Sequence, residues 1–233
     1  MTDLIPYIEQ QFRIIREPYA RVLIGGSTEE WEALTLQLFH PDFFGMANVL
    51  EWQQQECLPP EPILLRREDG QPLATNRQMS LLESVLGSRG RSGGQLEIWE
   101  AVFGPVGDEG YLKPLCDKSA GVIDHHVTEY MREHGCDLRN YAEKNWAKIG
   151  PSLAGMLHCY SGDTDSFYLN LGVYLFDDVL KTAKNPYYAG SFEYVRPLKG
   201  HGCQPVTNAE LVRQMARYIK DRAKGHYRSA ING

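Results

Sequence analysis

A serine near the N-terminus stands between a short apolar run and a helical pattern. The segment at residues 22–31 reads VLIGGSTEEW, so the apolar run ends in two glycines and Ser27 before the helical pattern begins. A strand that turns sharply into a helix is typical of a nucleophile elbow, in which the turn lifts a serine hydroxyl out of the backbone. The segment therefore predicts Ser27 as a nucleophile, with a structural turn serine as the alternative. Glu29 stands where the usual G-x-S-x-G pattern ends in glycine.

Two further polar loops follow apolar runs and supply an acid and a base. Asp163 and Asp165 come after residues 155–160, and His201 stands between glycines after a later apolar run. Serine hydrolysis needs a base within hydrogen-bond reach of the hydroxyl and an acid that orients the base. We interpret His201 as the base, with a structural histidine as the alternative. We prefer Asp165 as the acid, because its distance from Gly162 is the usual spacing after such a strand, and we expect Asp163 to cap the following helix.

Strands that alternate with helices must position these loops. The predicted helices cover residues 3–15, 31–40, 124–132, 138–147, 167–181 and a stretch from 207 onward, and the predicted strands cover 21–24, 155–160 and 190–195. This alternation predicts an α/β fold with a mostly parallel sheet flanked by helices, in which ligands gather at the carboxyl ends of the strands. We expect a single domain over residues 1–233, with an insert-like region at 42–120 where the signals are weak.

Composition and charge exclude several classes of function. The chain has 233 residues, 42% of them hydrophobic, and a formal net charge of -6, with no block of lysine and arginine. Nucleic-acid binding needs a basic surface, so no nucleic-acid partner is expected. No apolar run reaches the roughly 20 residues of a membrane helix, and no signal peptide is recognisable. These features predict a cytoplasmic protein without a membrane partner.

Cysteines and histidines give no sign of a metal or a cofactor. The five cysteines are scattered without a C-x-x-C pair. His125, His126 and His134 lack the spacing of a helical zinc pair such as H-E-x-x-H. We therefore expect no disulfide framework, no metal and no cofactor, and a small molecule as the ligand.

Five short segments resemble one esterase family. They are IPYIE at 5–9, GGST at 25–28, YSGDTD at 160–165, FYLN at 167–170 and GHG at 200–202. The family is the branch of the α/β-hydrolase fold that contains esterase D, feruloyl and acetylxylan esterases, enterochelin esterases and mycolyltransferases. The chain order Ser, Asp, His is also the order that this fold uses. The resemblance extends from the first predicted helix to the last.

The resemblance implies hydrolysis of a carboxylic ester through a serine acyl-enzyme. It implies Ser27 as the nucleophile, His201 as the general base and Asp165 as the orienting acid, with Asp163 as the alternative acid. The backbone amide of Thr28 is then one donor to the oxyanion. The expected partner is a small-molecule ester substrate.

Two departures from the family pattern lead to a second hypothesis. The family's sheet begins several strands before the elbow, whereas only 21 residues precede Val22 here. The chain therefore resembles a partial α/β-hydrolase that lacks the N-terminal strands and the loop with a second oxyanion amide. Such a sheet keeps an exposed edge, which is a site for pairing with a second copy of the chain or another partner chain.

Glu29 and Glu30 also replace small residues, and we expect them to loosen the turn or to place negative charge beside the oxyanion. The alternative function is a non-catalytic hydrolase remnant or binding subunit that needs a partner chain to complete its sheet.

Overall fold

A computed structural model describes most of the chain as a mixture of helices and strands. The described residues are 2–52, 83–86, 91–118, 120, 122–165, 169–201 and 203–232. Much of the predicted insert-like region at 42–120, namely residues 53–82 and 87–90, lies outside the described residues.

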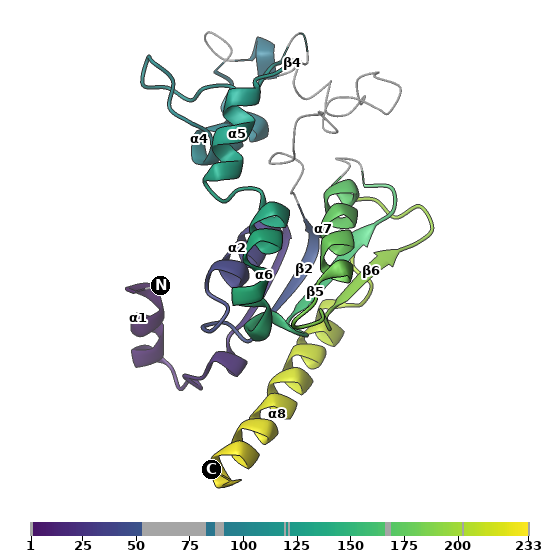
Figure 1. The fold of residues 1–233 in the computed structure, drawn as a ribbon. Helices are drawn as coiled ribbons and strands as arrows, with labels where there is room; N and C mark the ends of the chain where they lie inside the picture. The colour runs from purple at the N-terminus through teal and green to yellow at the C-terminus, as the bar shows by residue number, and fades with distance from the viewer. Residues whose placement is uncertain are drawn as a thin grey trace.

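Four strands form the main sheet (Figure 1). They are β1 (Val22–Ser27), β2 (Met46–Trp52), β5 (Leu157–Gly162) and β6 (Ser191–Val195). Their order is β1-β2-β5-β6, and each neighbouring pair is parallel. The carboxyl ends of the strands therefore meet at one edge, and the loops that follow β1, β5 and β6 come together there. These three strands lie where the apolar runs predict strands.

Strand β2 is not predicted from the sequence, whose signals weaken after residue 42. It begins with Met46 opposite Val22 of β1, and its Ala47 also pairs with Leu157 of β5. The start of the predicted insert-like region is thus a central strand of the sheet.

Helices cover one face of the sheet and extend from its ends (Figure 1). They are α1 (Leu4–Gln11), the short 3-10 helix η1 (Pro18–Ala20), α2 (Thr28–Phe39), α4 (Gln95–Phe103), α5 (His125–Glu133), α6 (Leu138–Leu153), α7 (Asn170–Thr182) and α8 (Asn208–Asn232). Helix α6 contacts both α2 and α7, and α2 and α7 contact the strands. Helix α8 lies at the amino end of β2, where the Tyr218 hydroxyl donates to the carbonyl oxygen of Gly45 at 2.6 Å.

The main apolar core lies between the sheet and these three helices. Trp31, Leu34 and Leu38 enter it from α2, while Leu157 and Cys159 enter it from β5. Helices α6 and α7 contribute Leu138, Ala142, Trp146, Ile149, Leu153, Val173, Phe176 and Leu180. Burial of apolar area is the main favourable contribution to folding, so this core fixes α2 and α7 against the strands whose ends carry the candidate site.

A smaller unit of α4, α5, β3 (Cys116–Asp117) and β4 (Val122–Ile123) is drawn above the main sheet in Figure 1. The two short strands pair antiparallel. Aromatic rings join this unit to α2: the ring centroid of Trp31 lies 5.5 Å from that of Trp99 and 4.6 Å from that of Phe103, both in edge-on geometry. Such pairs add to the free energy of area burial, so they fix α4 on the first turns of α2.

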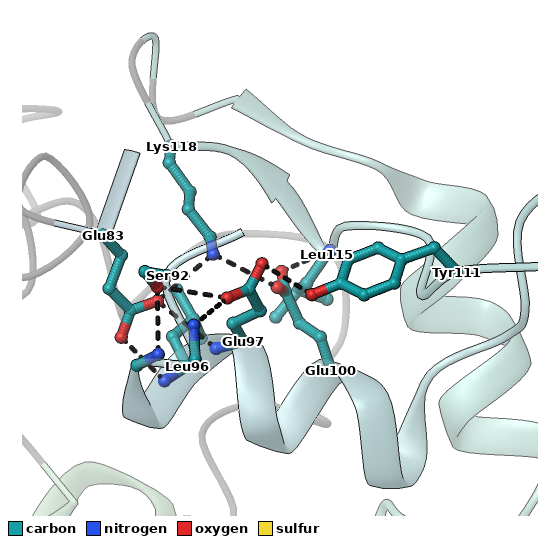
Figure 2. Close-up of polar contacts among 10 residues, drawn as sticks. Glu83, Ser92, Leu96, Glu97, Glu100, Tyr111, Leu115 and Lys118 are labelled. Carbon is teal, nitrogen blue, oxygen red and sulfur yellow. Dashed lines mark hydrogen bonds and ion pairs between the residues drawn. The ribbon is translucent and has the colours of Figure 1, made fainter. Parts of the chain in front are cut away.

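Around the first turn of α4, carboxylates add polar contacts to the apolar packing of the smaller unit (Figure 2). Glu83 accepts the backbone N–H groups of Leu96 at 3.0 Å and Glu97 at 3.3 Å. Glu97 in turn accepts the backbone N–H of Gly93 at 2.5 Å and the hydroxyl of Tyr111 at 3.1 Å. The first N–H groups of a helix have no partner within the helix, and these carboxylates supply partners for them.

Lys118 is the cation of this cluster. Its Nζ lies 3.2 Å from a carboxylate oxygen of Glu83 and 3.5 Å from one of Glu100. The side chains are only 10% exposed for Lys118 and 2% for Glu100. Burial raises the pKa of Glu100, and the charge of Lys118 acts against that rise.

Lys118→Met is expected to lower the free energy of unfolding by about 3 kcal/mol, because it leaves buried carboxylates without their cation. The measurement is urea unfolding near pH 7. The loss should shrink as the pH falls, since a protonated Glu100 no longer needs a cation. The matched control is Lys113→Met: Lys113 is 44% exposed and 3.2 Å from Asp124, so less than about 1 kcal/mol is expected. Equal losses for the two variants would show that the buried ion pairs of Lys118 stabilise the fold no more than the exposed ion pair of Lys113.

Candidate active site

The turn between β1 and α2 holds Ser27 in a rare backbone conformation. Ser27 is the last residue of β1 and Thr28 is the first residue of α2, so the strand passes directly into the helix. The backbone angles of Ser27 are φ 60° and ψ -124°. A non-glycine residue with positive φ costs about 1–3 kcal/mol and is kept where the surrounding structure enforces it, often at active sites. The predicted elbow is therefore present as a geometric feature.

Gly25 permits the helix to approach the strand this closely. A Cβ atom built on Gly25 would lie 2.0 Å from the carbonyl oxygen of Glu29 and 2.6 Å from the backbone nitrogen of Glu30. These are backbone atoms of the first turn of α2, which cannot rotate away as a side chain could. The first glycine of the motif is thus required by the close packing of the helix on the strand.

The two glutamates do not loosen the turn, contrary to what the sequence leads us to expect. Glu29 is exposed at the surface, and only its backbone contacts the strand. Glu30 is fully buried. Its charge acts on the thiol of Cys159 in β5, whose pKa is raised by burial first and by Glu30 second. The expected loosening is not seen, because the close packing depends on the space at Gly25. The other part of the expectation, negative charge beside the oxyanion, stays a prediction.

His201 lies between Ser27 and Asp165, although 174 residues separate it from the serine in the sequence. Its Nε2 is 3.1 Å from the Oγ of Ser27, and its Nδ1 is 2.8 Å from Oδ2 of Asp165. Both distances are within hydrogen-bond range. The side chain of Asp165 has no exposed surface, and that of His201 is 24% exposed. The structure thus brings these three predicted residues together, in one continuous hydrogen-bonded series.

Helix α7 positions the carboxylate of Asp165. Its second oxygen, Oδ1, accepts the backbone N–H of Leu169 at 3.2 Å. Leu169 directly precedes α7, so this contact places the negative charge at the positive end of the helix dipole. One carboxylate oxygen is therefore fixed by the helix, and the other is directed at His201.

Asp163 does not have the role that the sequence predicts for it. Leu169 holds the cap position of α7, and the carboxylate that accepts its N–H is that of Asp165, so Asp163 is not the cap of that helix. Its Oδ1 instead accepts the backbone N–H of Lys199 at 2.9 Å. This hydrogen bond lowers the pKa of Asp163. The prediction failed because the partner belongs to a different loop, which sequence spacing does not reveal.

Thr28 is placed next to the serine at the start of α2. Its backbone amide belongs to the helix N-terminus, where amide dipoles favour negative charge. This is the end of the helix at which an anion adjacent to Ser27 is stabilised.

Two other kinds of feature are absent from the described residues. No group of three or more histidine, cysteine, aspartate or glutamate side chains there is arranged to hold a metal ion. No helix in the same part of the chain is long and apolar enough to cross a membrane.

The chain has limited similarity to known proteins. No protein-family model matches the sequence, and no curated protein matches it. Among solved structures, a ferulic acid esterase is similar with 16% identity and a TM-score of 0.49, over 94% of this chain and 58% of that protein. The fluorophosphonate-binding serine hydrolase F (FphF) of Staphylococcus aureus, solved with substrate bound, is similar with 14% identity and a TM-score of 0.41, over 94% of this chain and 61% of that protein. The chain therefore spans less than two thirds of either protein.

Proposed function

We propose that the chain is a serine hydrolase of the α/β-hydrolase type, which cleaves a carboxylic ester through an acyl-enzyme. The observation that carries the proposal is the hydrogen-bonded series from Ser27 through His201 to the buried Asp165. Ser27 ends β1, while His201 and Asp165 follow β6 and β5, so the three residues meet at the carboxyl edge of a parallel sheet, where ligands of such sheets bind. The strained elbow at Ser27 adds support, because it holds the hydroxyl away from the backbone.

Acylation uses the two hydrogen bonds of His201. As the Oγ of Ser27 attacks the ester carbonyl carbon, Nε2 of His201 accepts the hydroxyl proton. The ionised carboxylate of Asp165 holds the Nδ1–H and stabilises the imidazolium that forms. The imidazolium then gives its proton to the leaving alkoxide, the carbon–oxygen bond to the alcohol breaks, and Ser27 carries the acyl group.

Deacylation repeats these steps with water. His201 takes a proton from a water molecule as its oxygen attacks the acyl carbon, and then returns the proton to the Oγ of Ser27. The carboxylic acid is released and the hydroxyl is restored. In both steps negative charge develops on the carbonyl oxygen, and the amide of Thr28 is our proposed donor to it.

A second candidate function is favoured by the exposed edge of the sheet. Strand β1 is the last strand at one side of the sheet among the described residues, and its Ile24 is 47% exposed. Helix α1 has no buried residue, and Leu4, Tyr7 and Phe12 are exposed there. An uncharged edge strand with an exposed apolar residue is a template for pairing with another strand. The alternative is therefore a binding subunit whose sheet is completed by a second copy or a partner chain.

Labelling with a fluorophosphonate probe distinguishes the two functions, because the probe reacts only with an activated serine. The wild-type protein is expected to be labelled on Ser27, as located by peptide mass spectrometry, and to hydrolyse short p-nitrophenyl esters. Ser27→Ala should abolish both, whereas the control Ser152→Ala, on the remote end of α6, should keep both. The same samples are measured by gel filtration with light scattering. A protein that is unlabelled, inert and associated into oligomers would reject the hydrolase and favour the binding subunit.

A further inference from the structure

The base and the acid of the proposed site lie on different loops, so contacts between the two loops must fix their relative position. Asp165 follows β5, His201 follows β6, and 36 residues separate them. Catalysis falls steeply when reacting groups are misplaced by about 1 Å. The backbone around each residue therefore has to be fixed as well as its side chain.

The segment that leads into the His201 loop, residues 196–199, is exposed. Leu198 has a positive φ of 54°, and its side chain is 79% exposed. Among the described residues, the main core cluster includes Tyr194 on β6 and none of residues 196–199. The guanidinium carbon of Arg196 lies 5.7 Å from the centroid of the Tyr194 ring. The polar contacts of this segment are therefore the candidates for placing the loop.

Lys199 is held through its backbone by two residues of the acid loop. Its N–H donates to Oδ1 of Asp163 at 2.9 Å. Its carbonyl oxygen accepts the backbone N–H of Thr164 at 2.9 Å and the hydroxyl of Thr164 at 3.0 Å. Lys199 lies two residues before His201, and the two residues that hold it directly precede Asp165. The three hydrogen bonds thus join the two loops next to the reacting side chains.

The two loops also touch at Gly162. A Cβ atom built there would lie 2.3 Å from the carbonyl oxygen of Lys199 and 2.7 Å from that of Gly200. Only glycine leaves room for the two backbones to approach so closely. The close approach of the loops after β5 and β6 therefore depends on glycine at position 162.

We propose that Asp163 is a positioning residue, which with Thr164 latches the backbone of Lys199 and so places the imidazole of His201 between Asp165 and Ser27. This inference rests on the proposed function, because it assigns Asp163 a part in the same site. Asp163 touches neither Ser27 nor a reacting atom and acts through the loop alone. Ionisation of Asp163 strengthens the latch, since a carboxylate accepts a stronger hydrogen bond than a neutral group.

The test compares Asp163→Ala with Asp163→Asn, whose amide oxygen can still accept the N–H of Lys199. Asp163→Ala is expected to lower kcat for a p-nitrophenyl ester about 10-fold to 100-fold with little change in KM. Asp163→Asn should recover most of this loss. Asp178→Ala, which removes an exposed carboxylate from α7, is the matched control and should behave as wild type. Circular dichroism and thermal melting confirm that each variant is folded.

A second readout does not depend on turnover. An imidazole Nδ1–H bound to a carboxylate gives a downfield proton resonance in NMR spectra, which is assigned to His201 by its loss in His201→Gln. The resonance is expected in the wild type, in Asp163→Asn and in Asp178→Ala, and it should disappear in Asp163→Ala. Its persistence in Asp163→Ala would overturn the latch, whatever the esterase result. Its loss there supports the latch even if the wild type hydrolyses no ester, in which case only the proposed function fails. If Asp163→Ala does not fold, Thr164→Val takes its place, with a weakened resonance expected and an unchanged one counting against the latch.

Discussion

Ser27→Ala and His201→Ala are each expected to lower kcat/KM for ester hydrolysis by about 10,000-fold or more, and the double variant is expected to fall no further. The reason is the geometry of the site. The Ser27 hydroxyl and the His201 imidazole share one hydrogen bond of 3.1 Å, so neither group can take part in the proton transfer without the other. Residues that act as one unit give losses that do not add. The measurement is steady-state hydrolysis of p-nitrophenyl acetate near pH 8 by the two single variants and the double variant.

Two comparisons make this result specific to the series of hydrogen bonds. Asp165→Asn keeps the size of the side chain but removes the charge that stabilises the imidazolium, so it should also cause a large loss. Ser152→Ala should leave the rate unchanged. If the loss in the double variant equalled the product of the two single losses, Ser27 and His201 would act independently, and the proposed mechanism would be wrong.

The candidate residues could be predicted because parallel strands deliver their carboxyl ends to one edge. Ser27, Asp165 and His201 each follow a short apolar run, and a sheet built from such runs brings the loops together. Residue type then adds the chemistry, since a hydroxyl, a carboxylate and an imidazole are what acyl transfer requires. Local pattern and topology are therefore enough to nominate these three positions.

Strand β2 could not be predicted by the same reasoning. Its sequence, MANVLEW, is short and does not alternate between apolar and polar residues. Strands of parallel sheets often lack such alternation, so periodicity gives little signal for this short strand. Its place between β1 and β5 is determined by pairing with residues far away in the chain, which local pattern does not contain.

Contacts made by the backbone are also invisible in the sequence. The latch on Lys199 uses its N–H and carbonyl groups, which every non-proline residue possesses, so the lysine gives no signal. Glu30 illustrates the reverse case. Its size, in place of a small residue, predicts a loosened turn, whereas the Glu30 side chain is fully buried and α2 still packs closely on Gly25. Residue types thus identify reacting groups better than they identify the groups that hold them.

Gly25→Ala is expected to lower the free energy of unfolding by more than about 4 kcal/mol, or to prevent folding. The added methyl group would lie 2.0 Å from the carbonyl oxygen of Glu29, well inside van der Waals contact. Overpacking by a methyl group in a well-packed place typically costs about 1–3 kcal/mol, and here the neighbours are backbone atoms that cannot change rotamer. The measurement is urea unfolding of the variant and the wild type under the same conditions.

Gly110→Ala separates the steric clash from ordinary glycine effects. Gly110 has a positive φ of 73°, and a Cβ atom there would meet nothing within 4 Å, so its substitution should cost only the backbone strain of about 1–2 kcal/mol. A loss at Gly25 no larger than that at Gly110 would mean that α2 does not approach β1 as closely as described.

If Gly25→Ala folds, α2 must move away from β1. Because Ser27 joins that strand to α2, its Oγ would then leave the 3.1 Å contact with His201, and fluorophosphonate labelling should be lost together with stability.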